Sequence, residues 1–123
     1  MKQAHIGTDI IEISRLRDAL ARWGEHFSQR VYTEAELRLC RGRAESLAAR
    51  FAGKEAVMKA LGGEGVGLNW KEIEILAESG GKPILELHGA TRGKAEALGL
   101  KNLEISLSHS RDLAIAFVVG ISD

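Results

Sequence analysis

The sequence predicts one α+β domain in which an antiparallel sheet packs against a long helix. Four stretches have strand length and either alternate polar with apolar residues or run apolar: 71–75, 84–88, 103–107 and 113–119. They form two pairs, each joined by a short turn, which is typical of antiparallel hairpins. The longest segment with apolar residues at helical spacing is 44–61. No linker or internal repeat interrupts the pattern, so residues 1–123 are expected to form a single domain.

The N-terminal third is expected to contain a strand followed by a helix. Residues 4–12 are rich in isoleucine and predict the first strand. Ser14 is a suitable N-cap for a helix that runs to about Trp23, where Gly24 follows. The segment 25–32 is interpreted as a short connection.

A capping signal and a glycine delimit the two helices that follow. Thr33 and Glu36 have the spacing of a capping box, which begins a helix that ends near Gly42. The long helix is expected to run from near Ala44 to Leu61. Gly62 suits the left-handed conformation that closes such a helix.

The C-terminal half alternates strands with one helix. Ser79–Pro83 forms the turn of the first hairpin, and residues 90–98 predict a helix that Gly99 ends. His109–Asp112 forms the turn of the second hairpin. The strand after it, 113–119, is nearly all apolar, which predicts burial on both faces.

Composition excludes several classes of protein. Hydrophobic residues make up 45% and charged residues 28%, as in ordinary globular domains. The formal net charge is zero, which gives no support for bulk attraction to nucleic acid or to an anionic membrane. Cys40 is the single cysteine, so no intrachain disulfide forms. With no apolar targeting segment or bilayer-spanning stretch, we expect a cytoplasmic protein.

Two acids stand in segments that otherwise predict burial. Asp9 interrupts the apolar run Ile6–Ile11, and Glu55 lies in the long helix between Lys54 and Lys59. A buried acid is costly unless it is paired or binds a metal. Mg²⁺ prefers a few carboxylates together with water and substrate phosphates, and lysines neutralise phosphate oxygens. The combination indicates a magnesium site that handles phosphates.

Each acid also has a simpler explanation. Asp9 could be a strand-end acid satisfied by backbone amides or by an arginine. Glu55 and Lys59 have the spacing of a helical ion pair, which stabilises a helix by only ~0.3–0.5 kcal/mol. Only the occurrence of both acids together favours the metal site.

Three further features could contribute to a site. The glycine-rich segment 62–67 lets the backbone approach a ligand, or it is a helix cap and flexible connector; it is not a Walker loop. His109 could be a general base, a phosphate or base contact, or a turn residue. Arg15 and Arg22 lie on one face of the first helix, which is either a solvated surface or a docking surface for an acidic partner. The other histidines are interpreted as surface or strand residues: His5, His26 and His88.

Three blocks in this order resemble the holo-(acyl-carrier-protein) synthases, the short bacterial type of 4′-phosphopantetheinyl transferase. They are Gly7–Ile13, with a Gly-x-Asp strand, Arg50–Gly62, with a Lys-Glu-Ala-x-x-Lys helix, and Ser106–Ser110. Gly81–Pro83 is similar to the hairpin turn of this family. The order, the spacing and the total length agree, so the resemblance covers essentially the whole chain and implies the 4′-phosphopantetheinyl transferase-like fold.

The resemblance implies a Mg²⁺-dependent transfer of the phosphopantetheine arm of coenzyme A to a serine of apo acyl carrier protein, which releases adenosine 3′,5′-bisphosphate in fatty acid biosynthesis. It implies the catalytic residues Asp9, Glu55 and Lys59, with Asp9 and Glu55 as metal ligands. The coenzyme A site would be lined by Arg50, Lys54, Lys59, Gly63, Gly65, Gly67 and His109. Acidic acyl carrier protein would dock on Arg15, Arg22 and their neighbours. The family's short type implies a homotrimer with sites between subunits.

The residues do not decide whether the general base is a metal-ordered water, Glu55 or Asp9, and we favour water oriented by the carboxylates.

The sequence departs from the family pattern at two places. Gly53 stands where alanine is common in the family, and the segment 62–67 is one residue longer than in some relatives. Glu64 is expected to face outward, away from phosphates.

Two alternative functions are compatible with the same residues. One is a transferase that serves other carrier proteins, although those enzymes are usually about twice as long. The other is a non-catalytic module that binds coenzyme A. A nucleic-acid-binding domain is disfavoured, because the sequence is neutral and does not interleave aromatic with basic residues.

Overall fold

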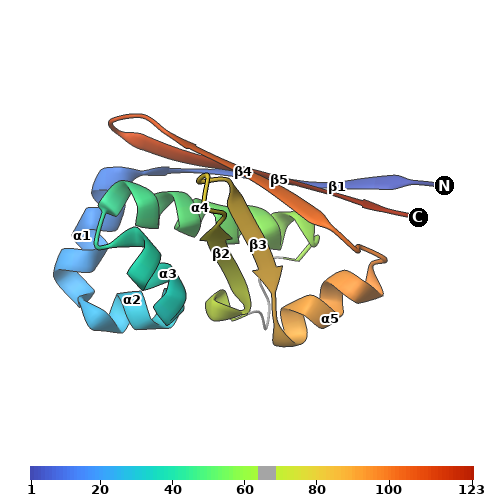
Figure 1. Cartoon of the computed structure of the whole chain (residues 1–123), viewed down its shortest axis with the longest axis horizontal. Helices are drawn as coiled ribbons and strands as arrows, with labels where there is room; N and C mark the ends of the chain where they lie inside the picture. The colour runs from blue at the N-terminus through green and yellow to red at the C-terminus, as the bar shows by residue number, and fades with distance from the viewer. Residues whose placement is uncertain (64–68) are drawn as a thin grey trace.

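The computed structural model describes residues 1–63 and 69–123. Its larger sheet has three antiparallel strands in the order β1 (Gln3–Glu12), β5 (Leu113–Ser122) and β4 (Leu103–His109). The first and last strands pair along their whole length, so the two termini lie side by side (Figure 1). A second sheet consists of the hairpin β2 (Ile73–Ala77) and β3 (Pro83–Leu87).

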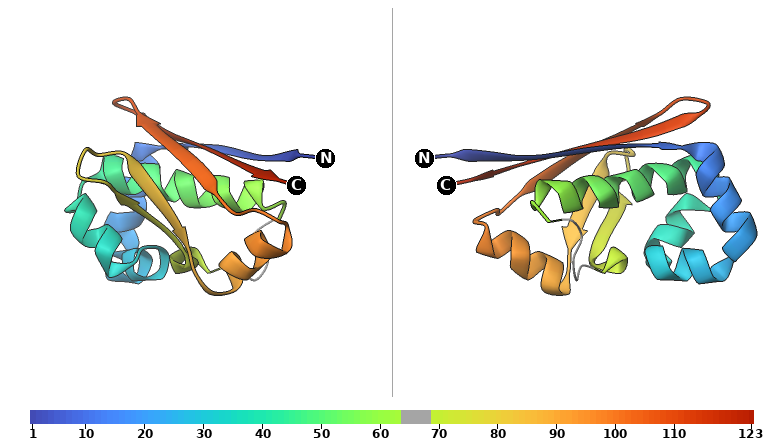
Figure 2. Two further views of the ribbon diagram at one scale, coloured as in Figure 1. Left: turned by 45° about the vertical axis from the view of Figure 1, so that its right-hand side comes forward. Right: turned by 180° about the vertical axis from the view of Figure 1, so that it is seen from behind.

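One long helix, α4 (Ala44–Ala60), packs against one face of the larger sheet and also contacts β2. Figure 2 shows it running beneath the strands, with the other helices below it at the two ends of the molecule. Those helices are α1 (Ile13–Trp23), α2 (Glu25–Val31) and α3 (Glu34–Cys40) at one end and α5 (Gly89–Ala97) at the other. The expected α+β class, with an antiparallel sheet packed on a long helix, is therefore confirmed.

The contact between β1 and α4 is unusually close because Gly7 has no side chain. A Cβ built at Gly7 would lie 1.8 Å from the carbonyl oxygen of Ala56 and 2.9 Å from the amide nitrogen of Ala60. Both alanines are buried. Small residues on both elements thus let the two backbones approach each other, which fixes the position of β1 along α4.

The capping box at α3 is confirmed. The amide of Glu36 donates to Thr33 Oγ1 at 3.2 Å, and the Thr33 amide donates to Glu36 Oε1 at 2.9 Å. The expected end of α4 is confirmed as well, since Gly62 adopts φ 73° directly after the C-cap residue Leu61.

The expectation that Ser14 caps the first helix was wrong. α1 begins at Ile13, and its N-cap residue Glu12 makes no side-chain cap hydrogen bond. β1 continues directly into the helix, and the amide of Ile13 donates to the carbonyl of Asp112 at 2.8 Å. The turn between β4 and β5 thus provides an acceptor for the first amide of α1, which has no partner within the helix.

The segment 25–32, interpreted as a connection, contains helix α2. Its seven residues show little periodicity, but Phe27 stacks on Phe51 of α4 with ring centroids 6.1 Å apart. Tertiary packing rather than local propensity therefore holds this helix.

The first hairpin starts later than predicted. Trp70–Glu72 forms a 3₁₀ turn, so β2 begins at Ile73 instead of Lys71. Ile73 and Ile75 point into the core, as their alternation with glutamates predicts.

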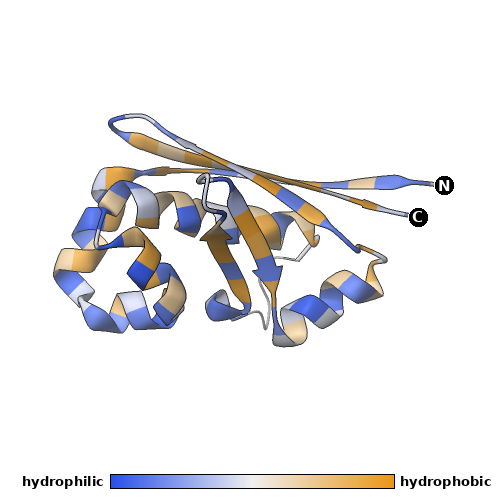
Figure 3. Ribbon diagram, viewed as in Figure 1, coloured by the Kyte–Doolittle hydropathy of each residue, from blue (hydrophilic) through white to orange (hydrophobic). Residues whose placement is uncertain are grey.

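The prediction that strand 113–119 is buried on both faces was wrong. Alternate residues of β5 point toward α4 and are fully buried, among them Ala116 and Val118, whereas Ile115 and Phe117 are 43% and 46% exposed. Together with β1, these residues form an apolar outer face of the sheet: Ile6, Ile10, Leu113, Ile115, Phe117 and Ile121. Figure 3 shows apolar residues along these strands, on the layer that no helix covers from above.

No helix in the described ranges has both the length and the apolar character needed to cross a bilayer.

Candidate active site

Asp9 and Lys59 meet where β1 crosses α4. Lys59 Nζ donates to Asp9 Oδ1 at 3.1 Å and to the carbonyl oxygen of Thr8 at 2.9 Å. The Asp9 side chain is 20% exposed and that of Lys59 is 55% exposed. The pair therefore lies at the surface, where a ligand can reach it.

Glu55 is one helical turn before Lys59 and adds a second carboxylate to this group. Burial raises the pKa of the Glu55 carboxyl, the negative charge of Asp9 raises it further, and Lys59 lowers it. Within the described residues, no hydrogen bond to the Glu55 carboxylate is found. Two carboxylates share one ammonium group here, so the site has excess negative charge that suits a divalent cation.

Lys54 lies on a different side of α4 from Glu55, inside the protein. Its side chain is 0% exposed, and Nζ donates to Glu36 Oε1 at 2.8 Å, to the Trp70 carbonyl at 3.0 Å and to the Ile73 carbonyl. All three donors of the ammonium group are used within the chain. The expected contact of Lys54 with coenzyme A is therefore contradicted, and the residue has a structural role.

Arg50 and His109 do not reach the Asp9 group within one chain. Arg50 is directed toward β2, where its Nε donates to the Ile75 carbonyl at 3.0 Å. His109 is an exposed residue at the end of β4. Asp9 is in register with Ala116 of β5, and Ala116 is in register with Leu107 of β4. His109 thus lies two strands across the sheet from Asp9 and two residues further along.

The glycine-rich segment is only partly described. Gly63 follows the end of α4 and is partly exposed. The expectations for Gly65, Gly67 and Glu64 concern residues outside the described ranges.

The arginines of α1 form an exposed basic surface. Arg15 and Arg22 are both exposed, and the guanidinium of Arg22 lies 5.5 Å from the ring centroid of Trp23. No carboxylate of the described residues lies within ion-pair distance of either arginine, so both charges are accessible to a partner.

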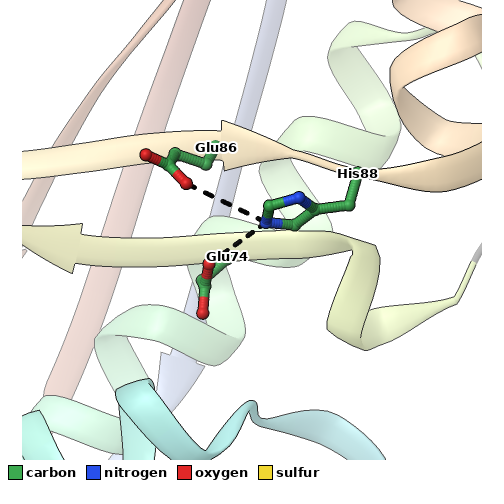
Figure 4. A group of neighbouring side chains, drawn as sticks. All are labelled: Glu74, Glu86 and His88. Atoms are coloured by element: carbon green, nitrogen blue, oxygen red, sulfur yellow. Dashed lines mark hydrogen bonds and ion pairs between the residues drawn. The ribbon is translucent and has the colours of Figure 1, made fainter.

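Sequence reasoning missed a group of three possible ligands on the β2–β3 hairpin. His88 Nε2 lies 3.1 Å from Glu74 Oε1 and 4.0 Å from Glu86 Oε2 (Figure 4). The sequence alone indicates only a surface or strand residue at His88, with no other candidate ligand beside it. The register of the hairpin, which sets Glu74 opposite Glu86, is the signal that could have identified the group.

An open pocket of about 770 Å³ lies between β3, α5 and the start of β4. Its lining includes the apolar residues Leu85 and Leu100 and the cationic residues Arg92 and Lys101. Asp9, Glu55 and Lys59 do not line it, so it is separate from the acidic group under β1.

Residues 5–118 match the family described as the 4′-phosphopantetheinyl transferase superfamily. The chain belongs to this superfamily. Within it, the sequence is 52% identical over 122 residues to a holo-(acyl-carrier-protein) synthase of Herpetosiphon aurantiacus, covering 94% of this chain and 96% of the relative. It is 55% identical over 116 residues to a holo-(acyl-carrier-protein) synthase of Dehalococcoides mccartyi, covering 94% and 97%.

A solved superfamily structure has the same fold. The Helicobacter pylori holo-(acyl-carrier-protein) synthase, in complex with coenzyme A, superposes with a TM-score of 0.85 at 34% identity and covers 94% of this chain and 98% of its own. The resemblance stated from the three sequence blocks is confirmed, and so is the expected transferase. The match extends over nearly the whole length of each of these relatives.

Proposed function

We propose that the chain is a holo-(acyl-carrier-protein) synthase that transfers the phosphopantetheine arm of coenzyme A to apo acyl carrier protein, at a site built on Asp9, Glu55 and Lys59. The observation that carries this proposal is the meeting of the Gly-x-Asp strand and the Lys-Glu-Ala-x-x-Lys helix, which brings Lys59 Nζ to 3.1 Å from Asp9 Oδ1. The chain's relatives at 52% and 55% identity are synthases of this name, which supports the same reaction here.

In this proposal Asp9 and Glu55 hold Mg²⁺. The two carboxylates and the raised pKa of Glu55 fit a cation that would relieve their mutual repulsion. When bound, Mg²⁺ neutralises the charge that develops on pyrophosphate oxygens during transfer. Glu55 must be ionised to act as a ligand, so binding of the cation is expected to weaken as the pH falls through the pKa of Glu55.

The side chains then divide the work of the displacement. The serine oxygen of the carrier bonds to the phosphorus next to pantetheine, and the bond from that phosphorus to the bridging oxygen breaks, which releases adenosine 3′,5′-bisphosphate. Lys59 provides an exposed ammonium group, already oriented by Asp9 and the Thr8 carbonyl, that can turn to a phosphate oxygen. The serine proton goes to water that the carboxylates orient, because a carboxylate that holds a metal is a weak base.

We further propose that the functional unit is a homotrimer with its sites between subunits. The apolar outer face of the sheet, defined above, is supported as the contact surface because no element of the described chain covers it. Arg50 and His109 lie away from Asp9 within one chain, so a neighbouring copy would supply them to the coenzyme A site. Lys54 is not part of this proposal.

Phe117→Lys tests the assembly. A charge in the centre of the outer face should dissociate the trimer to monomers and reduce transfer at least tenfold, measured by sedimentation and by a turnover assay. Leu98→Lys is the matched control, since Leu98 is 37% exposed but lies at the C-terminal end of α5. If the Phe117→Lys protein stayed trimeric, the outer face would not be the trimer interface.

The proposed carrier-docking surface is Arg15 and Arg22 on α1, whose exposed charges suit an acidic partner. We also propose a cytoplasmic location. The single thiol, Cys40, is unpaired and buried, which fits a reducing compartment.

The decisive experiment incubates the protein with coenzyme A, Mg²⁺ and apo acyl carrier protein and measures the mass of the carrier. The intact protein should add one phosphopantetheine arm. Asp9→Ala and Glu55→Gln should each lower kcat by orders of magnitude while the Tm stays within a few degrees. Absence of transfer by the intact protein would refute the function, and near-normal turnover of either variant at limiting Mg²⁺ would refute the ligand set.

A further inference from the structure

The β2–β3 hairpin brings three donor groups together on one side. Glu74 of β2 is in register with Glu86 of β3. His88 follows Glu86 by two residues, so its side chain emerges on the same face of the strand. Figure 4 shows the imidazole between the two carboxylates. In the described part of the chain, this is the only group of three or more histidine, cysteine or acidic residues whose donor atoms come together in this way.

The spacing of the donor atoms is close to that of a coordination sphere. Ligand atoms bound at about 2.0–2.2 Å to one ion lie about 2.8–3.6 Å from each other in octahedral or tetrahedral geometry. His88 Nε2 and Glu74 Oε1 are 3.1 Å apart, within this range. His88 Nε2 and Glu86 Oε2 are 4.0 Å apart, and the Glu86 side chain is 54% exposed, so a small rotation brings it into range.

Glu74 is held in place by a residue of a different element. Thr33 Oγ1 donates to Glu74 Oε2 at 2.7 Å, and the same hydroxyl accepts from the amide of Glu36 in the capping box of α3. This bond leaves Oε1 of Glu74 facing His88, on a side chain that is only 13% exposed. The hydrogen bond from Thr33 thus orients the Glu74 carboxylate toward His88.

The charge on the hairpin also favours a cation. Two carboxylates directly opposite each other on neighbouring strands repel. Among the described residues, no lysine or arginine forms an ion pair with Glu74 or Glu86, and only the His88 imidazole lies between them. We propose that Glu74, Glu86 and His88 bind a divalent transition-metal ion of the Zn²⁺ type.

The donor set selects the class of ion. An imidazole nitrogen suits Zn²⁺, Co²⁺ or Ni²⁺, whereas Mg²⁺ and Ca²⁺ take oxygen ligands. The Mg²⁺ of the proposed transfer reaction would therefore not compete for this site. A bound ion would join β2 to β3 and, through Thr33, to the start of α3, so it should stabilise the fold without entering the reaction.

Calorimetric titration of the metal-free protein with Zn²⁺ in excess Mg²⁺ tests the proposal. One Zn²⁺ per chain should bind, and His88→Ala and Glu86→Gln should each weaken binding about tenfold or more. Co²⁺ bound to the native protein should show visible d–d absorption that His88→Ala removes. The His88 side chain makes no cap hydrogen bond to α5 and is 48% exposed, so its loss should not unfold the protein.

Two control variants separate this site from others. His26→Ala removes an exposed histidine of α2 and should leave Zn²⁺ affinity unchanged. Asp9→Ala should also keep it, while it abolishes transfer, so failure of the proposed function and failure of this site are distinguishable. No saturable Zn²⁺ binding, or binding that His88→Ala leaves intact, would overturn the proposal.

Discussion

Replacing the buried lysine of α4 by methionine should destabilise the protein strongly without acting on coenzyme A directly. Methionine has about the length of lysine but donates no hydrogen bond, so Lys54→Met removes the charge and keeps most of the volume. The change leaves the carboxylate of Glu36 in the interior, 0% exposed, with its amide donors but without its counter-charge. It also removes the donor from the carbonyls of Trp70 and Ile73.

The expected magnitude follows from these contacts. Removing one partner of a buried ion pair costs about 3–5 kcal/mol. An unfolding entropy of about 2.1 cal/mol/K per residue gives about 260 cal/mol/K for 123 residues. The Tm of Lys54→Met should therefore fall by about 12–19 °C. A loss of this size is a large part of the roughly 5–15 kcal/mol that stabilises an average domain.

The assay is thermal and urea unfolding of four proteins: native, Lys54→Met, Glu36→Gln and the double variant. Glutamine keeps an acceptor oxygen for the amides of Thr33 and Ile75 but has no charge. Glu36→Gln should therefore cost less in the Lys54→Met background than in the native protein, because the unpaired charge is then gone.

Lys59→Met is the matched control for the opposite behaviour. Its side chain is 55% exposed, so the Tm should change by only a few degrees while turnover falls. A Lys54→Met protein with near-native Tm and a raised KM for coenzyme A would refute our reasoning and restore Lys54 to the substrate site.

Three further predictions concern the active site and its surroundings. At pH 7, calorimetry should find a higher Tm for metal-free Glu55→Gln than for the native protein, because the raised pKa of Glu55 means that folding disfavours its ionised form. The difference in Tm should vanish below about pH 4, where the Glu55 carboxyl is protonated in both the folded and the unfolded protein. Gly7→Ala should cost more than the roughly 1–3 kcal/mol of ordinary overpacking, because its Cβ meets backbone atoms, whereas Gly93→Ala, in open space on α5, should stabilise by about 0.5–1 kcal/mol in urea unfolding. Arg15→Glu should raise the KM for acyl carrier protein several-fold and leave that for coenzyme A unchanged; Arg38→Glu, the same charge change on α3, should affect neither.

The order of strands and helices could be predicted from the sequence because its signals are local. The capping box at Thr33, the glycine after α4 and the alternation of β2 each depend on a few consecutive residues. Helix α2 could not be predicted in this way, since it depends on Phe27 packing against Phe51, which is distant in sequence.

The candidate site shows the same division between local and distant information. Lys54 and Glu55 are neighbours in sequence, but consecutive residues of a helix point about 100° apart, so the two side chains leave α4 in different directions. Sequence alone does not say which of them faces the interior. The buried Glu36 carboxylate determines the answer, because it lies between α3, β2 and α4 and forms an ion pair with Lys54. His88 was missed for a related reason, because its partner Glu74 becomes a neighbour only through the register of the hairpin.

The sequence contains the apolar residues of the sheet's outer face, but no described element of the chain covers them. An apolar strand such as β5 predicts two covered faces, and α4 covers only one. Exposure of Phe117 and Ile115 at 46% and 43% would be costly for a lone domain. The proposed assembly, with a second copy lying against the sheet, would account both for the wrong prediction of burial and for the division of the expected site residues between two parts of the chain.

The two sequence signatures of the family act as one structural device. Gly7 and Asp9 lie on the same face of β1, because alternate residues of a strand do. Gly7 lies against the backbone at Ala56 and Ala60, the residues that directly follow Glu55 and Lys59. The absence of a side chain at Gly7 therefore sets how closely Asp9 approaches Glu55 and Lys59, although Gly7 offers no ligand atom from a side chain. A larger residue there would move β1 away from α4 and separate the carboxylates, so the spacing of the proposed metal ligands depends on a contact between backbones.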